Sequence, residues 1–200
     1  MTLRCIFCVL TFATLLLGSI VSARAATLLK YNFEGTNTLT GMTGYFTSTG
    51  VAGTSTPTVT AVGTVNGYGT VNNLDVNNTA SNGLRLFVNS SAATGTWTAG
   101  VDSGILTLLT PNTLTNTGLL TLSFSLRSSR TNPVLVRVES YDATTNLRTG
   151  GLRTLIYPAS AGSYQRFALD LDKLTPDGTG AFVPNNSKFK VFFEIGNALG

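Results

Sequence analysis

Apolar residues alternate with polar ones in four segments of the C-terminal half of this 200-residue chain. Segment 120–126 reads Leu-Thr-Leu-Ser-Phe-Ser-Leu, and the same two-residue period recurs in segments 134–141, 166–171 and 188–195. A period of two places successive side chains on opposite faces of a β-strand, so each segment predicts a half-buried strand. Strands with one dry face and one wet face are typical of antiparallel sheets. Because no later segment of helical length shows an apolar stripe, the sequence predicts an all-β fold.

The alternation also predicts which side chains face the core. The expected inward set contains the apolar positions of these strands and one aromatic residue near the start of the chain. That set is Phe33, Leu122, Phe124, Val136, Val138, Phe167, Leu169, Val191 and Phe193. Tyr141 falls out of phase with Val136 and Val138. We therefore expect its ring on the opposite face of the sheet.

Turn-forming residues separate the predicted strands. Segment 142–151 ends in a Gly150-Gly151 pair, which predicts a hairpin between a strand over 133–142 and a strand over 151–157. Stretches rich in Pro, Gly, Ser and Asn predict two further loops, at 158–163 and 175–186.

The region 35–118 has a different composition. It is dense in Gly, Thr and Asn, and its short apolar pieces lie at 58–62, 84–88 and 105–109. So many strand-breaking residues limit strand length, and we expect long loops with short strands here. The alternative is poorly packed connecting sequence.

The first 25 residues have the features of an export signal. Arg4 supplies a positive charge, Cys5–Leu17 is an almost unbroken apolar run, and Ala23-Arg24-Ala25 offers small residues for cleavage. The run is shorter than the roughly 20 apolar residues that span a bilayer. We therefore predict a secreted or cell-envelope protein with a signal peptide at 1–25, one domain over 26–200 and no membrane span in the mature chain.

Removal of the signal leaves a chain without cysteine, because Cys5 and Cys8 are the two cysteines, and the chain has no histidine. This excludes Ser-His-Asp and Cys-His catalysis, and zinc sites built on imidazole or thiolate. The remaining hard oxygen ligands suit calcium. An exported domain without disulfides fits a bacterial envelope or exterior.

The charge pattern disfavours a nucleic-acid partner. Charged residues make up 11% of the chain, against about 25% in typical domains. Loss of Arg4 and Arg24 leaves 13 − 2 = 11 basic residues against 9 acidic ones. These basic residues are scattered singly along the sequence, whereas phosphate binding needs concentrated positive charge.

The chain stops at Gly200, only five residues after the predicted strand 188–195. A sandwich would usually need one further strand to return to its beginning. We therefore expect a C-terminally truncated domain that lacks its last strand, so that strand 188–195 forms an open edge.

The order of elements resembles a known family. Leu28–Gly35 is followed by a Gly-rich stretch with Gly83–Leu86, then by strand 119–127, hairpin 133–157 and segment 164–171. This order resembles the jelly-roll β-sandwich of family-4/16-type carbohydrate-binding modules of bacterial secreted and surface proteins. The most compact motif is the Phe-Glu-Gly that ends the first segment, and such a start is also similar to secreted proteins of the exosortase-sorted PEP-CTERM class. The resemblance implies an antiparallel jelly-roll sandwich.

The resemblance also implies site residues. In such modules an early glutamate often holds a structural calcium ion, which here would be Glu34; the alternative is a solvated carboxylate at a strand end. Sugar-binding modules present aromatic rings to the apolar face of a pyranose. The candidate rings are Trp97, Tyr45, Tyr68 and Tyr141, with packing in the core as the alternative for Trp97.

Three function classes remain open at this point. The first is a secreted non-enzymatic module that binds a polysaccharide or cell-surface glycan. The second is a structural or adhesive surface protein without a small ligand, which the low charge and the Thr/Asn-rich surface favour. The third is a carbohydrate-active enzyme that uses carboxylates. Asp170 and Asp172 would share one face of a strand about 7 Å apart, although their surroundings favour a strand that gives way to a turn.

Overall fold

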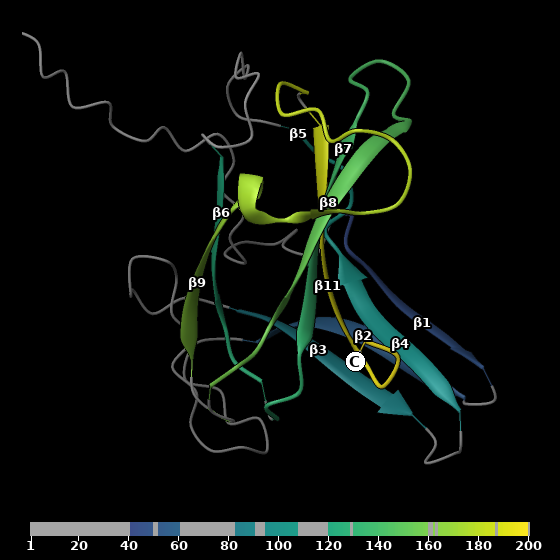
Figure 1. The fold of residues 1–200 in the computed structure, drawn as a ribbon. Helices are drawn as coiled ribbons and strands as arrows, with labels where there is room; N and C mark the ends of the chain where they lie inside the picture. The colour runs from purple at the N-terminus through teal and green to yellow at the C-terminus, as the bar shows by residue number, and fades with distance from the viewer. Residues whose placement is uncertain are drawn as a thin grey trace, which may run out of the picture.

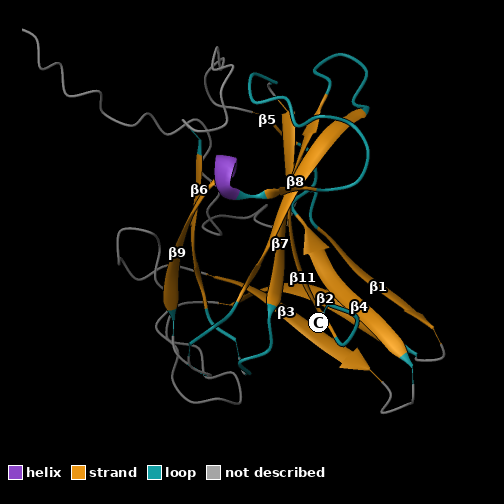
Figure 2. Ribbon diagram, in the orientation of Figure 1, coloured by secondary structure: helices purple, strands orange, loops and turns teal. Residues whose placement is uncertain are grey.

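The computed structural model describes residues 41–49, 52–60, 83–90, 95–107, 120–128, 130–159, 162, 164–186 and 188–199. The first strands along the chain are β1 (Thr43–Thr49), β2 (Gly53–Thr60), β3 (Gly83–Ser90), β4 (Thr96–Asp102), β5 (Leu106–Thr107) and β6 (Thr121–Leu126). The remaining elements are β7 (Val134–Tyr141), β8 (Arg148–Ile156), β9 (Gln165–Asp170), the 3-10 helix η2 (Leu171–Lys173), β10 (Thr175–Pro176) and β11 (Lys188–Gly196). Apart from η2, the regular secondary structure of the described part is thus strand (Figures 1 and 2), and this part contains no helix long and apolar enough to cross a bilayer.

Seven of these strands form one antiparallel sheet in the order β1-β4-β11-β7-β8-β10, with β5 paired to β11 (Figure 1). Strand β11 lies inside this sheet, because it pairs with β4 on one side and with β7 on the other. The expected open edge at strand 188–195 is therefore wrong. The neighbour that the sequence did not reveal is β4, which lies far earlier in the chain.

The pair β6–β9 covers one face of the large sheet. Leu122, Phe124 and Leu126 of β6, with Phe167 and Leu169 of β9, pack against the buried side chains Val134, Val136 and Ile156. The Phe124 ring lies 5.4 Å from that of Phe167 and 5.0 Å from that of Phe193 on β11. These aromatic contacts join the two layers. We call the covered side of the large sheet the inner face and the opposite side the outer face.

The pair β2–β3 covers the same inner face further along. Gly44 of β1 pairs with Val101 of β4, and Val101 pairs with Phe193, so all three project to the inner face. A Cβ atom on Gly44 would overlap the Ser55 carbonyl oxygen and lie 2.7 Å from Pro57 Cδ. Glycine at position 44 therefore lets β2 lie directly against β1. Both two-stranded sheets lie on one side, and the architecture is an antiparallel β-sandwich.

The predicted inward set agrees with this core. Seven of its members lie in or against the two buried clusters: Leu122, Phe124, Val136, Val138, Phe167, Leu169 and Phe193. Val191 pairs with Val138 and shares its face. Phe33 lies outside the described residues.

The predicted hairpin turn is shorter than expected. Strand β8 begins at Arg148, so Gly150 and Gly151 lie within the strand and not in the turn. The turn is closed instead by Asp142, whose carboxylate accepts the backbone N–H groups of Thr144 and Thr145 at 3.0 and 2.7 Å. A Cβ atom on Gly150 would overlap the Ala181 backbone, so this glycine allows a later loop to cross the strand.

The region 35–118 is richer in strands than predicted. Strands β1 to β4 are seven or eight residues long, and β1 and β4 belong to the large sheet. The expectation of long loops with short strands is wrong for the described parts of this region. Threonine, counted among its loop-forming residues, is β-branched and suits a pleated strand.

Removing the Phe124 ring should strongly destabilise the fold. We expect Phe124→Ala to lower the free energy of unfolding by about 3 kcal/mol, because its ring joins β9 and β11 across the sandwich. The control is Ser123→Ala on the same strand, whose side chain faces away from the core and whose loss should change stability by less than about 0.5 kcal/mol. Urea unfolding followed by tryptophan fluorescence measures both, and equal losses would contradict the assigned faces.

Candidate functional site

The outer face carries a row of directly paired residues across four strands. Arg153 of β8 pairs with Arg137 of β7, Arg137 with Phe192 of β11, and Phe192 with Asp102 of β4. Residues paired in this way project to the same side of a sheet. Arg137 alternates with the buried Val136 and Val138, so the whole row faces away from the sandwich core.

Arg137 is the centre of this row. Its Nη2 lies 2.8 Å from Oε1 of Glu194, and its Nη1 lies 3.5 Å from Asp177 and 3.7 Å from Glu139. The guanidinium carbon lies 4.0 Å from the centre of the Phe192 ring, a cation–π contact. Although burial disfavours its charge, the neighbouring Glu194 and Glu139 carboxylates hold the pKa of Arg137 above its ordinary value. The Arg137 guanidinium group therefore contacts three carboxylates and one aromatic ring.

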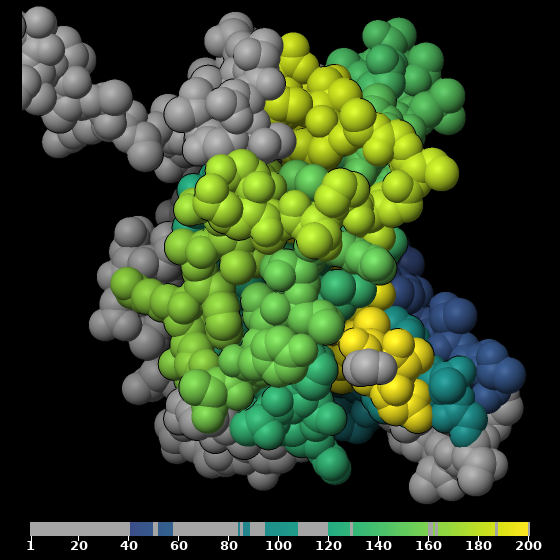
Figure 3. Space-filling model, in the orientation of Figure 1, coloured from purple at the N-terminus to yellow at the C-terminus, as the bar shows by residue number. Residues whose placement is uncertain are grey.

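Arg148 ties the loop after β10 to this network. Its Nε donates to Glu139 Oε1 at 2.9 Å, Nη1 donates to the Thr179 carbonyl at 2.8 Å, and Nη2 donates to the Asp177 carbonyl. Asp177 N–H in turn donates to the Gly151 carbonyl at 2.9 Å. In Figure 3 this yellow-green segment lies against the green strands β7 and β8.

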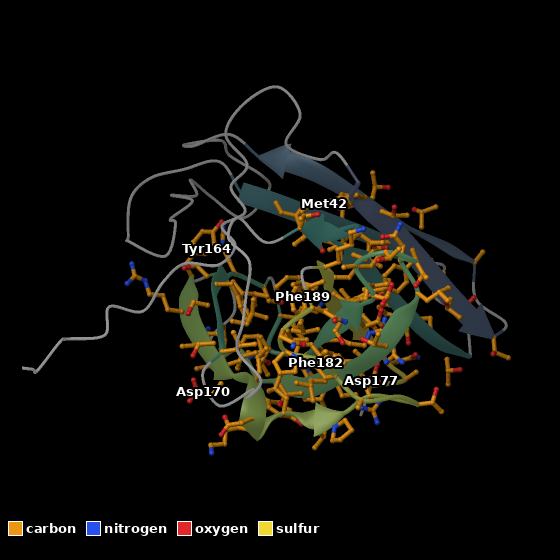
Figure 4. All side chains as sticks on the ribbon, turned by 90° about the horizontal axis from the view of Figure 1, so that it is seen from above. Met42, Tyr164, Asp170, Asp177, Phe182 and Phe189 are labelled. Carbon is orange, nitrogen blue, oxygen red and sulfur yellow. The ribbon has the colours of Figure 1, made fainter. Side chains whose placement is uncertain are left out.

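The same loop then crosses the edge of the sheet to the inner face. Its Phe182 ring packs 5.7 Å from that of Phe189, in the cluster that contains Val138 and Leu152 (Figure 4). Val183 N–H donates to Ser140 Oγ at 2.9 Å and fixes the crossing. The loop is thus anchored in the core at one end and by Arg148 at the other.

Two tyrosines, one from a strand on each side of β11, lie on the outer face. Tyr141 donates its hydroxyl hydrogen to Glu139, and burial together with this hydrogen bond raises the pKa of Tyr141. Tyr45 of β1 pairs with Gly100, where a Cβ atom would lie 2.6 Å from the tyrosine oxygen. Its ring lies 6.5 Å from that of Phe192, and its buried hydroxyl makes no hydrogen bond within the described structure. Burial, the Glu194 charge and the nearness of the Glu194 carboxylate to the hydroxyl raise the pKa of Tyr45, although this contact lacks the geometry of a hydrogen bond.

Lys190 of β11 supplies a further cation between these rings. Its Nζ lies 3.5 Å from Asp102 Oδ1, 5.8 Å from the centre of the Tyr141 ring and 6.0 Å from that of Phe192. The outer face therefore combines aromatic rings with fixed cationic and anionic side chains.

The structure places the predicted aromatic ligand-binding residues on different faces of the large sheet. Tyr45 and Tyr141 lie on the outer face, and Tyr141 takes the orientation that its phase predicted. Trp97 lies on the inner-face side with Ala99, half-buried and stacked on Phe46 at 5.8 Å with an angle of 8° between the rings. This stack gives Trp97 a packing role, and its part in ligand binding stays a prediction. Tyr68 lies outside the described residues.

The carboxylates of the enzyme alternative do not form a pair on one strand. Asp170 is the last residue of β9 and accepts the Thr121 hydroxyl at 2.9 Å. Asp172 belongs to η2 and pairs with the neighbouring Lys173 at 2.9 Å. The turn that the sequence suggested begins between them. Glu34, the predicted calcium ligand, lies outside the described residues. No group of three or more acidic side chains within the described ranges, the three around Arg137 included, is placed so that it could hold a metal ion.

Sequence reasoning missed the charged residues of the outer face. Arg137 and Glu139 share the phase of Tyr141, so the alternation in segment 134–141 already placed them beside it. Glu194 alternates with Phe193 and Ile195 in the same way. No signal in the sequence pointed to Asp177, because it reaches the site from a loop.

The sequence matches no protein-family model and no curated protein. Among solved structures, it is similar to a family 11 carbohydrate-binding module from Clostridium thermocellum in complex with a β-1,3-1,4-mixed-linked tetrasaccharide. The TM-score is 0.51 at 14% identity, over 84% of this chain and 84% of that chain. The family 11 module of the cellulosomal cellulase Lic26A-Cel5E of the same organism gives a TM-score of 0.43 at 14% identity, over 84% and 91% of the two chains.

The first likeness shows the fold. The chain has the jelly-roll β-sandwich found in carbohydrate-binding modules, as predicted. The structural similarity is to family 11, whereas the order of elements in the sequence resembled families 4 and 16.

The two tyrosines of the outer face should respond differently to loss of the hydroxyl. Tyr45→Phe removes a buried hydroxyl without a hydrogen bond, so the free energy of unfolding should stay within about 0.5 kcal/mol or rise. Tyr141→Phe removes a hydrogen bond to a carboxylate and should cost about 1–2 kcal/mol. Chemical unfolding of both variants tests this contrast, and a larger loss in Tyr45→Phe would contradict it.

Stability should fall in alkaline solution. The folded state raises the pKa of Tyr45 and Tyr141 above the ordinary value of 10.0 and so favours their neutral forms. This contribution is complete below pH 10.0 and is lost as the pH rises towards the folded-state pKa, because the unfolded tyrosines ionise first. Thermal unfolding between neutral and alkaline pH should show a shallower decline in the Tyr45→Phe/Tyr141→Phe double variant. An equally steep decline would exclude these two groups as the cause.

Proposed function

We propose that this protein is a secreted, non-enzymatic module that binds a glycan through the outer face of its large sheet. The observation that carries the proposal is the set of aromatic and charged side chains on the face that β2–β3 and β6–β9 leave uncovered. Among the described residues, the loop at Asp177–Thr179 is the segment that crosses part of this face.

The chemistry of the face suits a polysaccharide. A sugar ring has an apolar side, which stacks on aromatic rings, and hydroxyl groups, which bond to charged and amide side chains. Tyr45 and Tyr141 supply rings, while Arg137 and Lys190 supply donors beside them. Because ion pairs already fix the long side chains, little conformational entropy would be lost on binding.

The arrangement of the carboxylates favours binding over catalysis. Glu194 pairs with Arg137, Glu139 with Arg148, and Asp177 with both arginines. A glycosidase needs one carboxyl group that gives up a proton and one that acts as a base or nucleophile. The gathering of three carboxylates around Arg137 nevertheless keeps a carbohydrate-active enzyme as the second candidate.

Affinity electrophoresis and calorimetry against a panel of plant, algal and bacterial polysaccharides test the proposal. We expect at least one polymer to bind, and Tyr45→Ala and Tyr141→Ala to weaken that binding about tenfold each, which corresponds to about 1.4 kcal/mol. Phe87→Ala is the matched control, since this exposed aromatic residue lies on β3 in the other layer. Release of reducing ends should not be detected.

Each other outcome points to a different account. Loss of binding in Trp97→Ala with no effect of the tyrosine variants would move the site away from the outer face. Absence of binding to every polymer would favour a structural or adhesive surface protein. Reducing ends that disappear in Glu139→Gln or Glu194→Gln would identify an enzyme.

A further inference from the structure

The charged groups of the outer face lie in two tiers. The carboxylates form the deeper tier, with side chains 7% to 14% exposed: Glu139, Glu194, Asp177 and Asp102. The cations form the upper tier, with side chains 24% to 53% exposed: Lys190, Arg137, Arg148 and Arg153. A ligand that lies on this face therefore meets guanidinium and ammonium groups before it meets any carboxylate.

The pairing of two arginines shows how this arrangement is built. Arg153 and Arg137 are direct partners on β8 and β7, and like charges in such positions repel. Asp177 relieves the repulsion from the loop, since its two oxygens lie 3.6 Å from Arg153 and 3.5 Å from Arg137. Both guanidinium groups are thereby held side by side. Arg153 remains half in solvent, whereas Arg137 Nε is buried and has no hydrogen-bond acceptor within the described structure.

The balance of charges decides what kind of anion fits. Four cations lie above four carboxylates in this network, and Lys188, whose pairing with Tyr141 places it on the same face, adds one positive charge. The net charge of the face is therefore small and its long-range field is weak. The attraction acts at contact distance, where the nearer cations outweigh the deeper carboxylates. A densely charged polyphosphate is steered by net charge, whereas a polymer with spaced anionic groups and apolar ring faces uses local contacts.

Apolar side chains lie in the row next to the arginines. Leu155 of β8 pairs with Leu135 of β7, and the row continues through Glu194 and Gly100 to Tyr45 at the edge of the sheet. Sugar rings could lie on this row while their anionic groups reach the neighbouring arginines.

We infer that the outer face binds an acidic polysaccharide, with Arg153, Arg137 and Lys190 as donors to its anionic groups, in preference to a neutral one. This inference rests on the proposed glycan-binding function and names the class of glycan. Arginine presents a planar pair of N–H groups that matches both carboxylate and sulfate oxygens.

The test compares three polymers by calorimetry with the full chain: polygalacturonate for carboxylates, dextran sulfate for sulfates and a mixed-linkage β-glucan as the neutral polymer. We expect one acidic polymer to bind at least about tenfold tighter than the glucan, a difference of about 1.4 kcal/mol. Binding should weaken between about 50 mM and about 500 mM salt, because the Debye length shortens. The two acidic polymers distinguish a carboxylate ligand from a sulfate ligand.

Variants test whether Arg153 contributes to the preference for acidic polymers. Arg153→Gln should weaken acidic binding at least about threefold, since this residue is half exposed and its loss leaves the core intact. Arg153→Lys should recover part of the loss by keeping the charge without the planar pair of donors. Arg166→Gln is the matched control, because Arg166 is an exposed arginine on β9 in the other layer, and it should bind as the wild type does. Unfolding curves of all three variants confirm that they fold.

The remaining outcomes separate this inference from the proposed function. Tighter binding of the neutral glucan, with Arg153→Gln equal to the wild type, would overturn the acidic preference and leave glycan binding intact. Binding of a single-stranded DNA oligonucleotide as tightly as the acidic polymers would also overturn it, because charge alone would then explain the affinity. Failure of all three polymers to bind would reject the acidic preference, and the wider polysaccharide panel described above then decides whether the glycan-binding function stands.

Discussion

The contact between Arg137 and Glu194 is the interaction on which the outer face depends. It joins two neighbouring strands of the large sheet at 2.8 Å, and both side chains are largely removed from water. Removing one partner of such a pair leaves an uncompensated charge, which costs about 3–5 kcal/mol in buried sites. Asp177 and Glu139 share the same guanidinium, so the loop after β10 and strand β7 depend on it as well. The network thereby holds the side chains of Glu194, Glu139, Asp177 and Arg148 together.

Glycines shape the two faces of the large sheet as much as large side chains do, because they leave space for neighbouring elements. Gly44 allows β2 to approach the inner face, and Gly150 allows the loop that carries Asp177 to cross the sheet edge. On the outer face, Gly100 leaves space for the Tyr45 ring. A side chain at any of these positions would displace a neighbouring backbone or ring, so these glycines set the distances between layers.

The sequence predicted the strands whose two faces differ most in polarity. In β6, β7, β9 and β11 the large apolar residues alternate with other residues, apart from Leu135 and Phe192, which face outward, and the assigned faces agree with the core. The strands before residue 119 were harder to predict, because Thr and Gly form strands there through pairing with distant segments. Gly150-Gly151 had the composition of a turn, but the crossing loop needs them inside a strand. Local composition cannot reveal such long-range constraints.

The alternation of polar and apolar residues predicted part of the site as well. The phase of Tyr141 placed it on the outer face, and Arg137 and Glu139 follow from the same alternation. The basic residues are scattered singly in the sequence, yet strand pairing brings Arg137, Arg153 and Lys190 together on one face. Trp97 has small polar neighbours that suggest exposure, but its position in β4 turns it to the side of Phe46. Sheet register, which the sequence does not state, decided each of these placements.

A chemical-shift map by NMR spectroscopy tests the central claim most directly, that the outer face is the binding surface. Backbone amides and arginine Nε–H signals would be followed while an oligosaccharide of the bound polymer is added. The account predicts that the largest changes fall on β7, β8 and β11 and on the Nε–H groups of Arg137 and Arg153, while the Trp97 indole N–H and strands β6 and β9 stay unchanged. Changes centred on Trp97 and Phe46, or on β6 and β9, would contradict it.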